Sequence, residues 1–426
     1  MNRDEPPATK PAATGLTEHH AHLLMLGRSL TMADLSACTS RADMLERIAA
    51  KARHLAPDAW VLAHGARPEA WPDTRWPTRA ELDHAAGDRP VCAWCFDYHA
   101  IAASSAALAH AGIDAGSSFE HGRVVLDDNG EPSGLLLEHA AIALWDAVPE
   151  PAPGDRPGLV RAACDHLATL GYAEVHDMKA QPWLGQLLAD LDEAGELPVR
   201  VRLYALLDDL DPLFATRRAW QSDRITLGGG KIFVDGTLNS RTARVIHPYA
   251  DAPKGLAHGL AMMSPGELET AVRRVDALNL PLAAHAIGDA AVRDTLDAIE
   301  RARPKARGFR IEHAELIDAA DVPRFGELGV IASLQPCHLL ADIEALTRAL
   351  PDRLDRVLPV RELLDSGLGP GTGVVFGSDV PIVRADPGDS IQAAVHRRRA
   401  NMPAEQAVSP EQSIDEPTAW ACFGRA

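Results

Sequence analysis

The sequence predicts an α/β fold, namely a (β/α)8 TIM barrel with an insertion after its first strand. From about residue 157 onward, segments of helical periodicity alternate with short apolar segments typical of strands. Such alternation predicts a parallel sheet covered by helices. With the opening strand the count of strands reaches eight, and eight units predict a closed barrel with its active site at the carboxyl ends of the strands.

Each expected barrel strand has its own segment of sequence. The opening strand contains the Glu-His-His-Ala-His stretch at residues 18–22, and helices are expected at residues 158–170, 184–194 and 266–278 between later strands. The other seven strands are expected at residues 171–177, 199–205, 230–236, 280–285, 309–313, 329–335 and 373–379.

The insertion is expected at about residues 56–140, because this stretch exceeds a single βα loop and carries element signals of its own. Its segment 127–134 is rich in Gly, Pro, Asp and Asn, which predicts a hairpin turn. We expect the insertion to fold over the barrel mouth and to bring Trp76, Arg79 or His99 toward the site expected at the carboxyl ends of the strands. The alternative is that its tryptophans only pack in a core.

Composition and charge argue against several classes of protein. The 426 residues are 46% hydrophobic and 24% charged, values of an ordinary soluble globular protein. A net charge of -18 argues against a nucleic-acid partner. The sequence contains no run of about 18 apolar residues, so no membrane span is expected. Residues 1–14 lack the apolar core of a secretory signal and predict a flexible leader, which leaves residues 15–426 for the barrel and its insertion.

The six cysteines show no spacing typical of a disulfide framework, which suits a reducing cytoplasm. Cys92 and Cys95 form a CxxC pair, but they lie within an apolar run and no second pair follows. This context favours core packing over a zinc or redox role.

Candidate metal ligands recur where the expected strands end. His20 and His22 are two residues apart, so in a strand their imidazoles lie on the same face. A lone His-x-His pair is weak evidence, and each candidate taken singly is also compatible with an ordinary core or surface role. The further candidates fall at the ends of strands four, five, six and eight of the barrel: Lys231, His285, His313 and Asp379. Their joint occurrence predicts a divalent metal site.

Lys231 is the unusual member of this set, since an ammonium group repels a cation. Carboxylation would convert it into an anionic oxygen ligand that can bridge two ions. Without this modification Lys231 would act as an electrophile directed at the substrate.

Longer motifs accompany these residues along the chain, in the following order: Glu18-His19-His20-Ala21-His22, Trp76-Pro77-Thr78-Arg79, Asp97-Tyr98-His99-Ala100, Gly230-Lys231-Ile232-Phe233-Val234-Asp235-Gly236 with Ser240-Arg241-Thr242, His285-Ala286-Ile287-Gly288-Asp289, Arg310-Ile311-Glu312-His313-Ala314, Gln335-Pro336-Cys337-His338 and Phe376-Gly377-Ser378-Asp379. With these motifs the chain resembles the amidohydrolase superfamily from about residue 15 to 426. Within it the chain is similar to the YtcJ-like (amidohydrolase 3) group, which includes N-substituted formamide deformylase.

The resemblance implies one or two divalent metal ions, with zinc as the expected metal. It implies His20, His22 and Asp379 on one ion, His285 and His313 on the other, and carboxylated Lys231 as the bridge. A site with one ion and unmodified Lys231 is the alternative. The motifs also imply substrate-binding residues, namely Trp76, Arg79, Asp97, His99, Arg241, Gln335 and His338.

Two departures from the family pattern stand out. Family members carry a small β-sandwich built from segments before and after the barrel, and here both segments are expected to be missing. Apolar surface left bare on the barrel would then affect stability or oligomeric state, and a homodimer is the assembly we consider. The second departure is Glu18, where aspartate is usual; it is not an expected ligand.

The expected reaction is hydrolysis of a carbon–nitrogen bond, other than a peptide bond, in a small amide-type substrate. Divalent ions lower the pKa of a water molecule. A metal ion or His313 polarises the substrate carbonyl, Lys231 completes the catalytic set, and Asp379 carries the proton to the departing nitrogen.

Rival functions remain open at this stage. A deaminase or cyclic-amide hydrolase of the same superfamily is one, although the segment after His285 lacks the Glu expected of a deaminase. A ligand-binding barrel without activity is another, but it would be expected to have lost ligands. A glycoside hydrolase would need a Glu at the end of strand four or seven, and none stands there.

Overall fold

Eight parallel strands form the barrel of the computed structural model, in the order in which they occur along the chain. They are β1 (Leu16–Ala21), β8 (Tyr172–Asp177), β9 (Arg200–Leu206), β10 (Ile225–Phe233), β11 (Leu282–Ala286), β12 (Arg310–His313), β13 (Ile331–Leu334) and β14 (Val374–Phe376). A bridge between Ala21 and Val380 joins β1 to the segment after β14 and brings the sheet close to closure. The eight-stranded barrel expected from the sequence is therefore confirmed.

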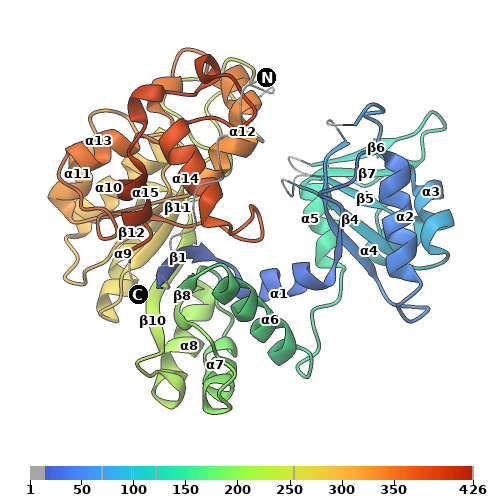
Figure 1. Ribbon diagram of the computed structural model, residues 1–426, viewed down its shortest axis with the longest axis horizontal. Coiled ribbons are helices and arrows are strands. Elements are labelled where there is room, and N and C mark those ends of the chain that lie inside the picture. The colour runs from blue at the N-terminus through green and yellow to red at the C-terminus, as the bar shows by residue number, and fades with distance from the viewer. Residues whose placement is uncertain are drawn as a thin grey trace. The chain divides into compact units, whose positions relative to one another are not determined.

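The structure describes residues 15–68, 71–96, 98, 100–119, 122–252 and 255–424. The chain divides into two compact units. The barrel unit comprises the chain up to Leu23 and from Val160 onward, and the second unit is Leu24–Leu159 (Figure 1).

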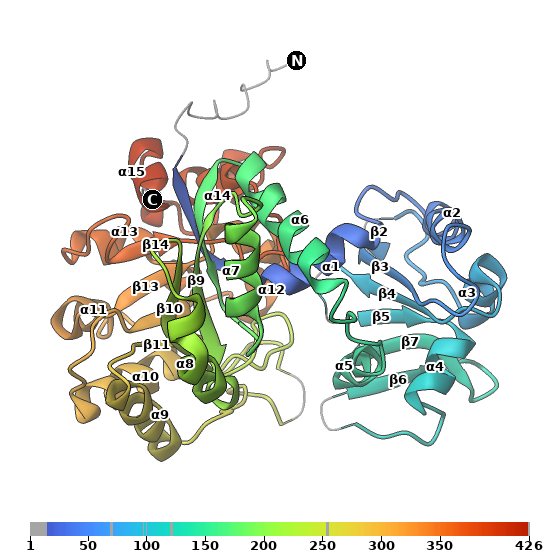
Figure 2. The same ribbon diagram turned by 90° about the horizontal axis from the view of Figure 1, so that it is seen from below.

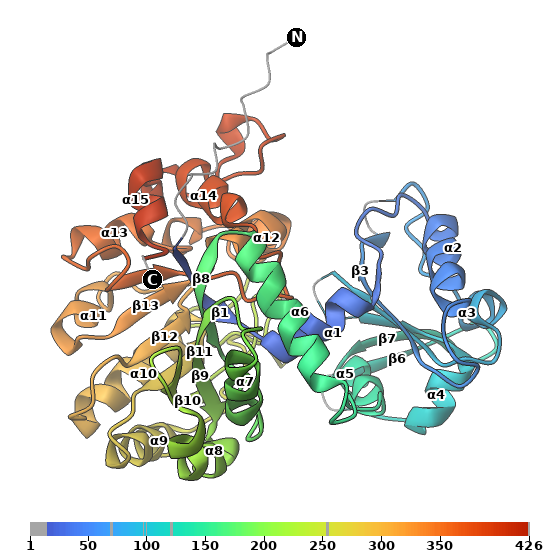
Figure 3. The same cartoon turned by 60° about the horizontal axis from the view of Figure 1, so that its bottom comes forward.

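Helices connect successive barrel strands and lie outside them (Figure 3). Residues expected to be helical at 158–170, 184–194 and 266–278 form α6 (Arg156–Thr169), α7 (Leu184–Glu193) and α9 (Pro265–Ala277). The remaining helices of the unit are α8 (Leu207–Trp220), α10 (Asp289–Ala302), α11 (Val322–Leu328), α12 (Pro336–Ala349), α13 (Val360–Asp365), α14 (Pro387–His396) and α15 (Glu416–Ala421), with short 3-10 turns η2 (Leu354–Arg356), η3 (Ala404–Gln406) and η4 (Pro410–Gln412). No helix among the described residues has both the length and the apolar character that a membrane crossing requires.

The fourth barrel strand, β10, shows the largest shift from its expected bounds. The strand expected at residues 230–236 begins earlier, at Ile225, and ends at Phe233. The strand contains three consecutive glycines, and a Cβ at Gly229 would lie 2.2 Å from the carbonyl oxygen of Pro281. Glycine at this position therefore allows a close approach of the neighbouring chain within the sheet.

The second unit contains a six-stranded mixed sheet (Figure 2). Its order is β2 (Ala33–Asp34), β3 (Val61–Ala66), β4 (Val91–Cys95), β5 (Ala100–Ala103), β7 (Pro132–Glu138) and β6 (Gly122–Leu126). The β6–β7 pair is antiparallel, as the turn-rich segment 127–134 predicts. The helices of the unit are α1 (Leu23–Thr31), α2 (Arg41–Ala52), α3 (Arg79–Ala86), α4 (Ser105–Ala111) and α5 (His139–Asp146).

Two apolar cores lie on opposite faces of this sheet, because successive residues of a strand alternate sides. Ala93 belongs to the core that includes Met44 and Ile48 of α2, and Trp94 belongs to the core that includes α4 and α5. Since α2 packs on the sheet, the unit starts earlier than the insertion of residues 56–140 expected from the sequence, and it extends to Leu159.

Candidate metal centre and active site

A bulge in β1 directs two histidines into the barrel mouth. The register of β1 against β8 slips between Glu18 and Ala21, where β1 holds one extra residue. His20 and His22 follow on the same side, with 5.5 Å between their ring centroids.

Asp379 lies opposite these two rings. Its Oδ1 atom accepts a hydrogen bond from Nε2 of His22 at 2.9 Å and lies 3.4 Å from Nε2 of His20. Burial alone would raise the pKa of Asp379, but the neighbouring His20 ring and the hydrogen bond from His22 outweigh it and hold the pKa below its usual value. The backbone of Asp379 is left-handed, with φ of 63°. Such a conformation is uncommon outside glycine and tends to occur at functional sites.

Glu18 fixes the relative position of β1 and the segment after β14. Its Oε1 atom accepts hydrogen bonds from the backbone N–H groups of His20 and Ser378, each at 2.9 Å, and Oε2 accepts from the Ser378 hydroxyl at 2.9 Å. Gly377 makes this approach possible, since a Cβ there would lie 2.6 Å from the backbone nitrogen of His20. Glu18 therefore joins the backbone of His20 to Ser378, the residue before Asp379.

His285 and His313 lie side by side at the ends of β11 and β12. Their ring centroids are 4.5 Å apart, and His313 is 4.9 Å from the ring of His20. Burial lowers the pKa of His285 to about 3 and that of His313 well below its usual value, so both rings are neutral. The Nδ1 atom of His313 is buried and has no hydrogen-bond partner among the described residues. Neutral imidazoles with free lone pairs are suited to divalent metals.

Lys231 is 1% exposed, and its amine has no hydrogen-bond partner within the described part of the chain. Burial lowers its pKa to about 8, although the charges of Glu312 and Asp379 oppose this effect. An unpaired amine is rare in a protein interior. It is available either for modification or for a ligand.

The donor atoms fit a divalent metal ion. Ligand atoms of His20, His313 and Asp379 lie within 4.8 Å of one another, and so do those of His313, Glu315 and His338. Two imidazoles and a carboxylate are a typical ligand set for zinc. His22, His285 and Lys231 surround the first group but are not members of it.

His338 has both ring nitrogens close to acceptors. Its Nε2 atom donates to the carbonyl oxygen of Ser378 at 3.1 Å, and its Nδ1 atom lies 3.7 Å from Oε1 of Glu315. Burial would lower the pKa of His338, but the nearby Glu315 carboxylate and the charge of Asp379 raise it to about 9. His338 therefore contributes positive charge next to Asp379.

Two further residues expected to bind substrate have defined partners in the barrel unit. The guanidinium of Arg241 donates to Asp251 and to the carbonyl oxygens of Leu238 and Asn239, so it holds its own loop together. Gln335 is 1% exposed, and its Nε2 atom lies 3.4 Å from Nδ1 of His20. Direct contact of either residue with a substrate remains a prediction.

The other expected substrate-binding residues are not placed relative to the metal centre. Trp76 packs against the core of the second unit that includes α2 and α3, and Arg79 lies 3.8 Å from Glu131 of the same unit. Asp97 and His99 lie outside the described residues. Their role at the barrel mouth stays a prediction.

Sequence reasoning missed three buried carboxylates that support the centre. Glu312 contacts His20, Glu315 contacts His338, and Asp235 accepts hydrogen bonds from the backbone of Ile287 and Gly288 after β11. One signal was available, because acidic residues within or directly after an apolar strand are seldom buried without a partner.

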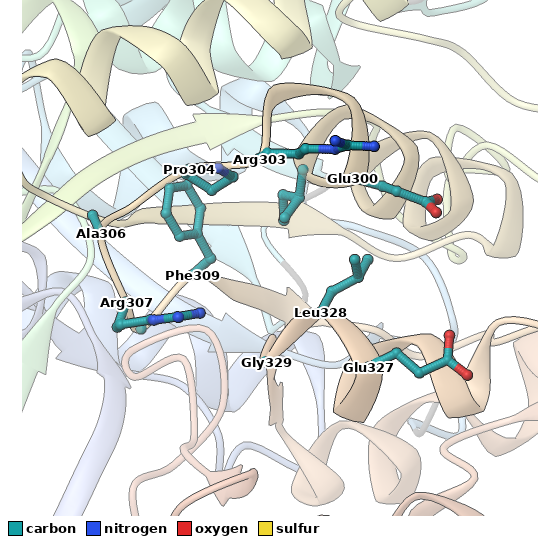
Figure 4. Close-up of a pocket in the computed structure, with 11 residues that line it drawn as sticks. Glu300, Arg303, Pro304, Ala306, Arg307, Phe309, Glu327, Leu328 and Gly329 are labelled. Atoms are coloured by element: carbon teal, nitrogen blue, oxygen red, sulfur yellow. The ribbon is translucent and has the colours of Figure 1, made fainter.

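Two cavities of the barrel unit lie at the opposite, amino ends of the strands. One of about 200 Å³ is formed where α10 and α11 end, with Phe309 and Leu328 among its lining residues (Figure 4). Another of about 580 Å³ is lined by Thr17, Glu174 and Arg202, among others. Neither contains the candidate ligands.

A (β/α)8 barrel with histidines and an aspartate gathered where its strands end has the architecture of a metal-dependent enzyme. An amidohydrolase family model matches residues 12–422. The chain is 30% identical over 395 residues to the amidohydrolase YtcJ of Bacillus subtilis (strain 168), which covers 91% of this chain and 73% of that protein. It is 26% identical over 428 residues to N-substituted formamide deformylase of Arthrobacter pascens, covering 95% of this chain and 78% of that protein.

Two solved structures are also similar to this chain over most of its length. An uncharacterized metal-dependent hydrolase from Pyrococcus horikoshii OT3 superimposes with a TM-score of 0.76 at 26% identity, covering 95% of this chain and 78% of that one. Another from Pyrococcus furiosus gives 0.74 at 28% identity, covering 95% and 80%. The chain belongs to the amidohydrolase family.

Proposed function

We propose that the protein is a metal-dependent hydrolase that cleaves the carbon–nitrogen bond of an amide or N-substituted formamide. The products are a carboxylate and an amine. The strongest support is the convergence of His20, His313 and Asp379, whose ligand atoms lie within 4.8 Å of one another. The similarity to a formamide deformylase supports the substrate class.

The residues of the chain divide the chemistry among them. A bound divalent ion supplies Lewis-acid chemistry, by which it lowers the pKa of a water molecule and polarises a carbonyl group. Asp379 is ionised and its Oδ1 atom faces His20 and His22, so Oδ2 is left to accept the water proton. The same carboxyl group then donates this proton to the departing nitrogen as the carbon–nitrogen bond breaks.

The two expected sets of ligands are retained in this proposal. His20, His22 and Asp379 would hold one ion, and His285 and His313 would hold a second. Lys231 would bridge them after its neutral amine adds to carbon dioxide and loses a proton, which forms a carbamate. The buried, unpartnered amine supports this modification.

The metal and the cellular compartment are proposed from the chemistry of the residues and not from the family match. Zinc is the proposed metal, because imidazole and carboxylate ligands suit it. The six cysteines are buried and have no spacing typical of a disulfide framework, which supports a reducing compartment such as the cytoplasm. A small-molecule substrate and a homodimer complete the proposal.

The test is hydrolysis by the purified, zinc- or manganese-loaded protein. The substrates are N-substituted formamides, N-acyl amino acids and cyclic ureas, and both acid and amine products are quantified. We expect equal amounts of acid and amine from at least one open-chain class. Cleavage of cyclic ureas alone would favour a cyclic-amide hydrolase, and metal binding without any turnover would favour a binding protein.

A further inference from the structure

An ion pair on β12 lies directly behind the candidate metal centre. Arg310 and Glu312 are two residues apart, so their side chains share one face of the strand. They are 2% and 0% exposed. Both Nε and Nη2 of Arg310 donate to the Glu312 carboxylate, the latter at 3.2 Å. A two-point contact of this kind keeps the carboxylate ionised and fixes its orientation.

Arg310 itself has little freedom to move. Its Nη2 atom also donates to the carbonyl oxygen of His19 at 2.8 Å and to the Ser333 hydroxyl at 2.7 Å, and Nη1 donates to Nδ1 of His176 at 3.0 Å. These partners come from β1, β8 and β13 as well as β12. The ion pair is therefore anchored to half of the barrel strands.

The second oxygen of Glu312 faces His20. Oε2 lies 2.7 Å from Nδ1 of His20. Since an ionised carboxylate only accepts hydrogen bonds, Nδ1 must carry the proton, and the lone pair of the neutral ring is then on Nε2. Nε2 is the nitrogen that lies 3.4 Å from Asp379. Gln335 could favour the other tautomer, but its amide nitrogen is 3.4 Å from Nδ1, a longer and uncharged contact.

We infer that Glu312, clamped by Arg310, is a positioning residue that fixes His20 as the Nδ1–H tautomer and directs its Nε2 lone pair toward Asp379 and the metal position. The metal part of this inference rests on the proposed function. The tautomer does not, because it follows from hydrogen bonds within the protein. A carboxylate behind a ligating histidine typically improves metal binding by orienting the ring.

His176 provides an internal comparison. Its Nδ1 atom accepts from Arg310, so its proton is on Nε2, which donates to Oε1 of Glu174 at 3.1 Å. His20 and His176 are thus expected to be opposite tautomers within one barrel. Glu174 forms the same type of contact as Glu312, but its histidine is not a proposed ligand. Glu174→Gln is therefore a matched control for Glu312→Gln.

The first test is nitrogen-15 NMR of the full-length, metal-free protein with labelled histidine, in which His20→Gln and His176→Gln assign the two rings. We expect a protonated Nδ1 in His20 and a protonated Nε2 in His176. A protonated Nε2 in His20 overturns the inference. This result does not depend on metal binding, and no substitution of Glu312 is needed for it.

The second test is zinc affinity, measured by competition with a chelator. We expect Glu312→Gln to weaken binding by about 10–100-fold, while Glu174→Gln stays close to the wild type. Equal affinities of Glu312→Gln and wild type would overturn the positioning role. A wild type that binds no zinc would instead count against the proposed function and leave the tautomer result standing.

Discussion

Replacing Asp379 by asparagine removes the group on which the proposed chemistry depends most. Asparagine keeps the size and one oxygen of the side chain but cannot take up and release a proton near neutral pH. The substitution also removes the negative charge from the ligand group of His20, His313 and Asp379. We therefore expect losses in both turnover and metal affinity.

The two losses can be estimated separately. General acid–base catalysis typically contributes about 10²–10⁴-fold to the rate, which corresponds to about 2.7–5.5 kcal/mol of activation free energy. Two unit charges about 4 Å apart in a medium of effective dielectric constant about 20 attract each other by about 4 kcal/mol, and a divalent ion doubles this value. Loss of the carboxylate charge therefore lowers metal affinity by at least about 10³-fold. At saturating zinc the metal site is filled, so kcat should fall only by the about 10²–10⁴-fold that general acid–base catalysis contributes.

The assay compares wild type, Asp379→Asn and Asp289→Asn in kcat at saturating zinc, in zinc affinity and in thermal unfolding. Asp289 is a suitable control because it is 6% exposed and accepts a hydrogen bond from the backbone of Ile246 at 2.8 Å, yet it belongs to neither ligand group. We expect the control to keep its turnover and Asp379→Asn to keep its fold. Wild-type kcat in Asp379→Asn at saturating zinc would refute the proton-transfer role.

Three further predictions concern Lys231, Gly377 and the metal. The pKa of Lys231, about 8 in the folded protein, is below its ordinary value of 10.5. The unfolded chain therefore binds more protons between these values, and the unfolding free energy of the metal-free protein should rise with pH across this window. In urea unfolding, the free energy of unfolding should rise less with pH in Lys231→Met than in the wild type. Incubation with bicarbonate above pH 8 should add the mass of one carbon dioxide to the wild type but not to Lys231→Met. Gly377→Ala should lower both the unfolding temperature and the zinc affinity, since the added Cβ would lie 2.8 Å from Oε1 of Glu18. Gly266→Ala should leave both quantities unchanged, because nothing lies within 4 Å of a Cβ at that position. Zinc at about 100 times its Kd should stabilise the fold by about 2.7 kcal/mol in calorimetry, and unchanged unfolding with zinc would contradict specific binding to the folded state.

The barrel could be predicted from the sequence because its signals are local. Apolar segments such as residues 280–285 alternate with helices whose caps are visible in the sequence, as in α9, where Ser264 and Glu267 form a capping box. The convergence of His20, His313 and Asp379 follows from the same pattern, since the carboxyl ends of parallel strands meet at one end of a barrel. Local patterns therefore predict both the fold and the proximity of these three side chains.

The supporting contacts could not be predicted because they join distant parts of the chain. Glu312 meets His20 across 292 positions, and Glu18 meets Ser378 across 360. The bulge that sets the orientation of His20 depends on the register between β1 and β8, which no pattern within β1 specifies. Arg241 illustrates the limit, since its place in a motif gave no sign of its pairing with Asp251.

The most direct test of the metal centre is the metal content of the purified wild-type protein, measured by elemental analysis after dialysis with zinc and compared with His20→Ala prepared in parallel. The proposed function predicts one or two equivalents of tightly held divalent metal in the wild type and a clear loss in the variant. It also predicts that a chelator abolishes hydrolysis and that added zinc restores it. A wild type that retains no divalent metal, or that hydrolyses its substrate equally well after complete removal of the metal, would contradict the account.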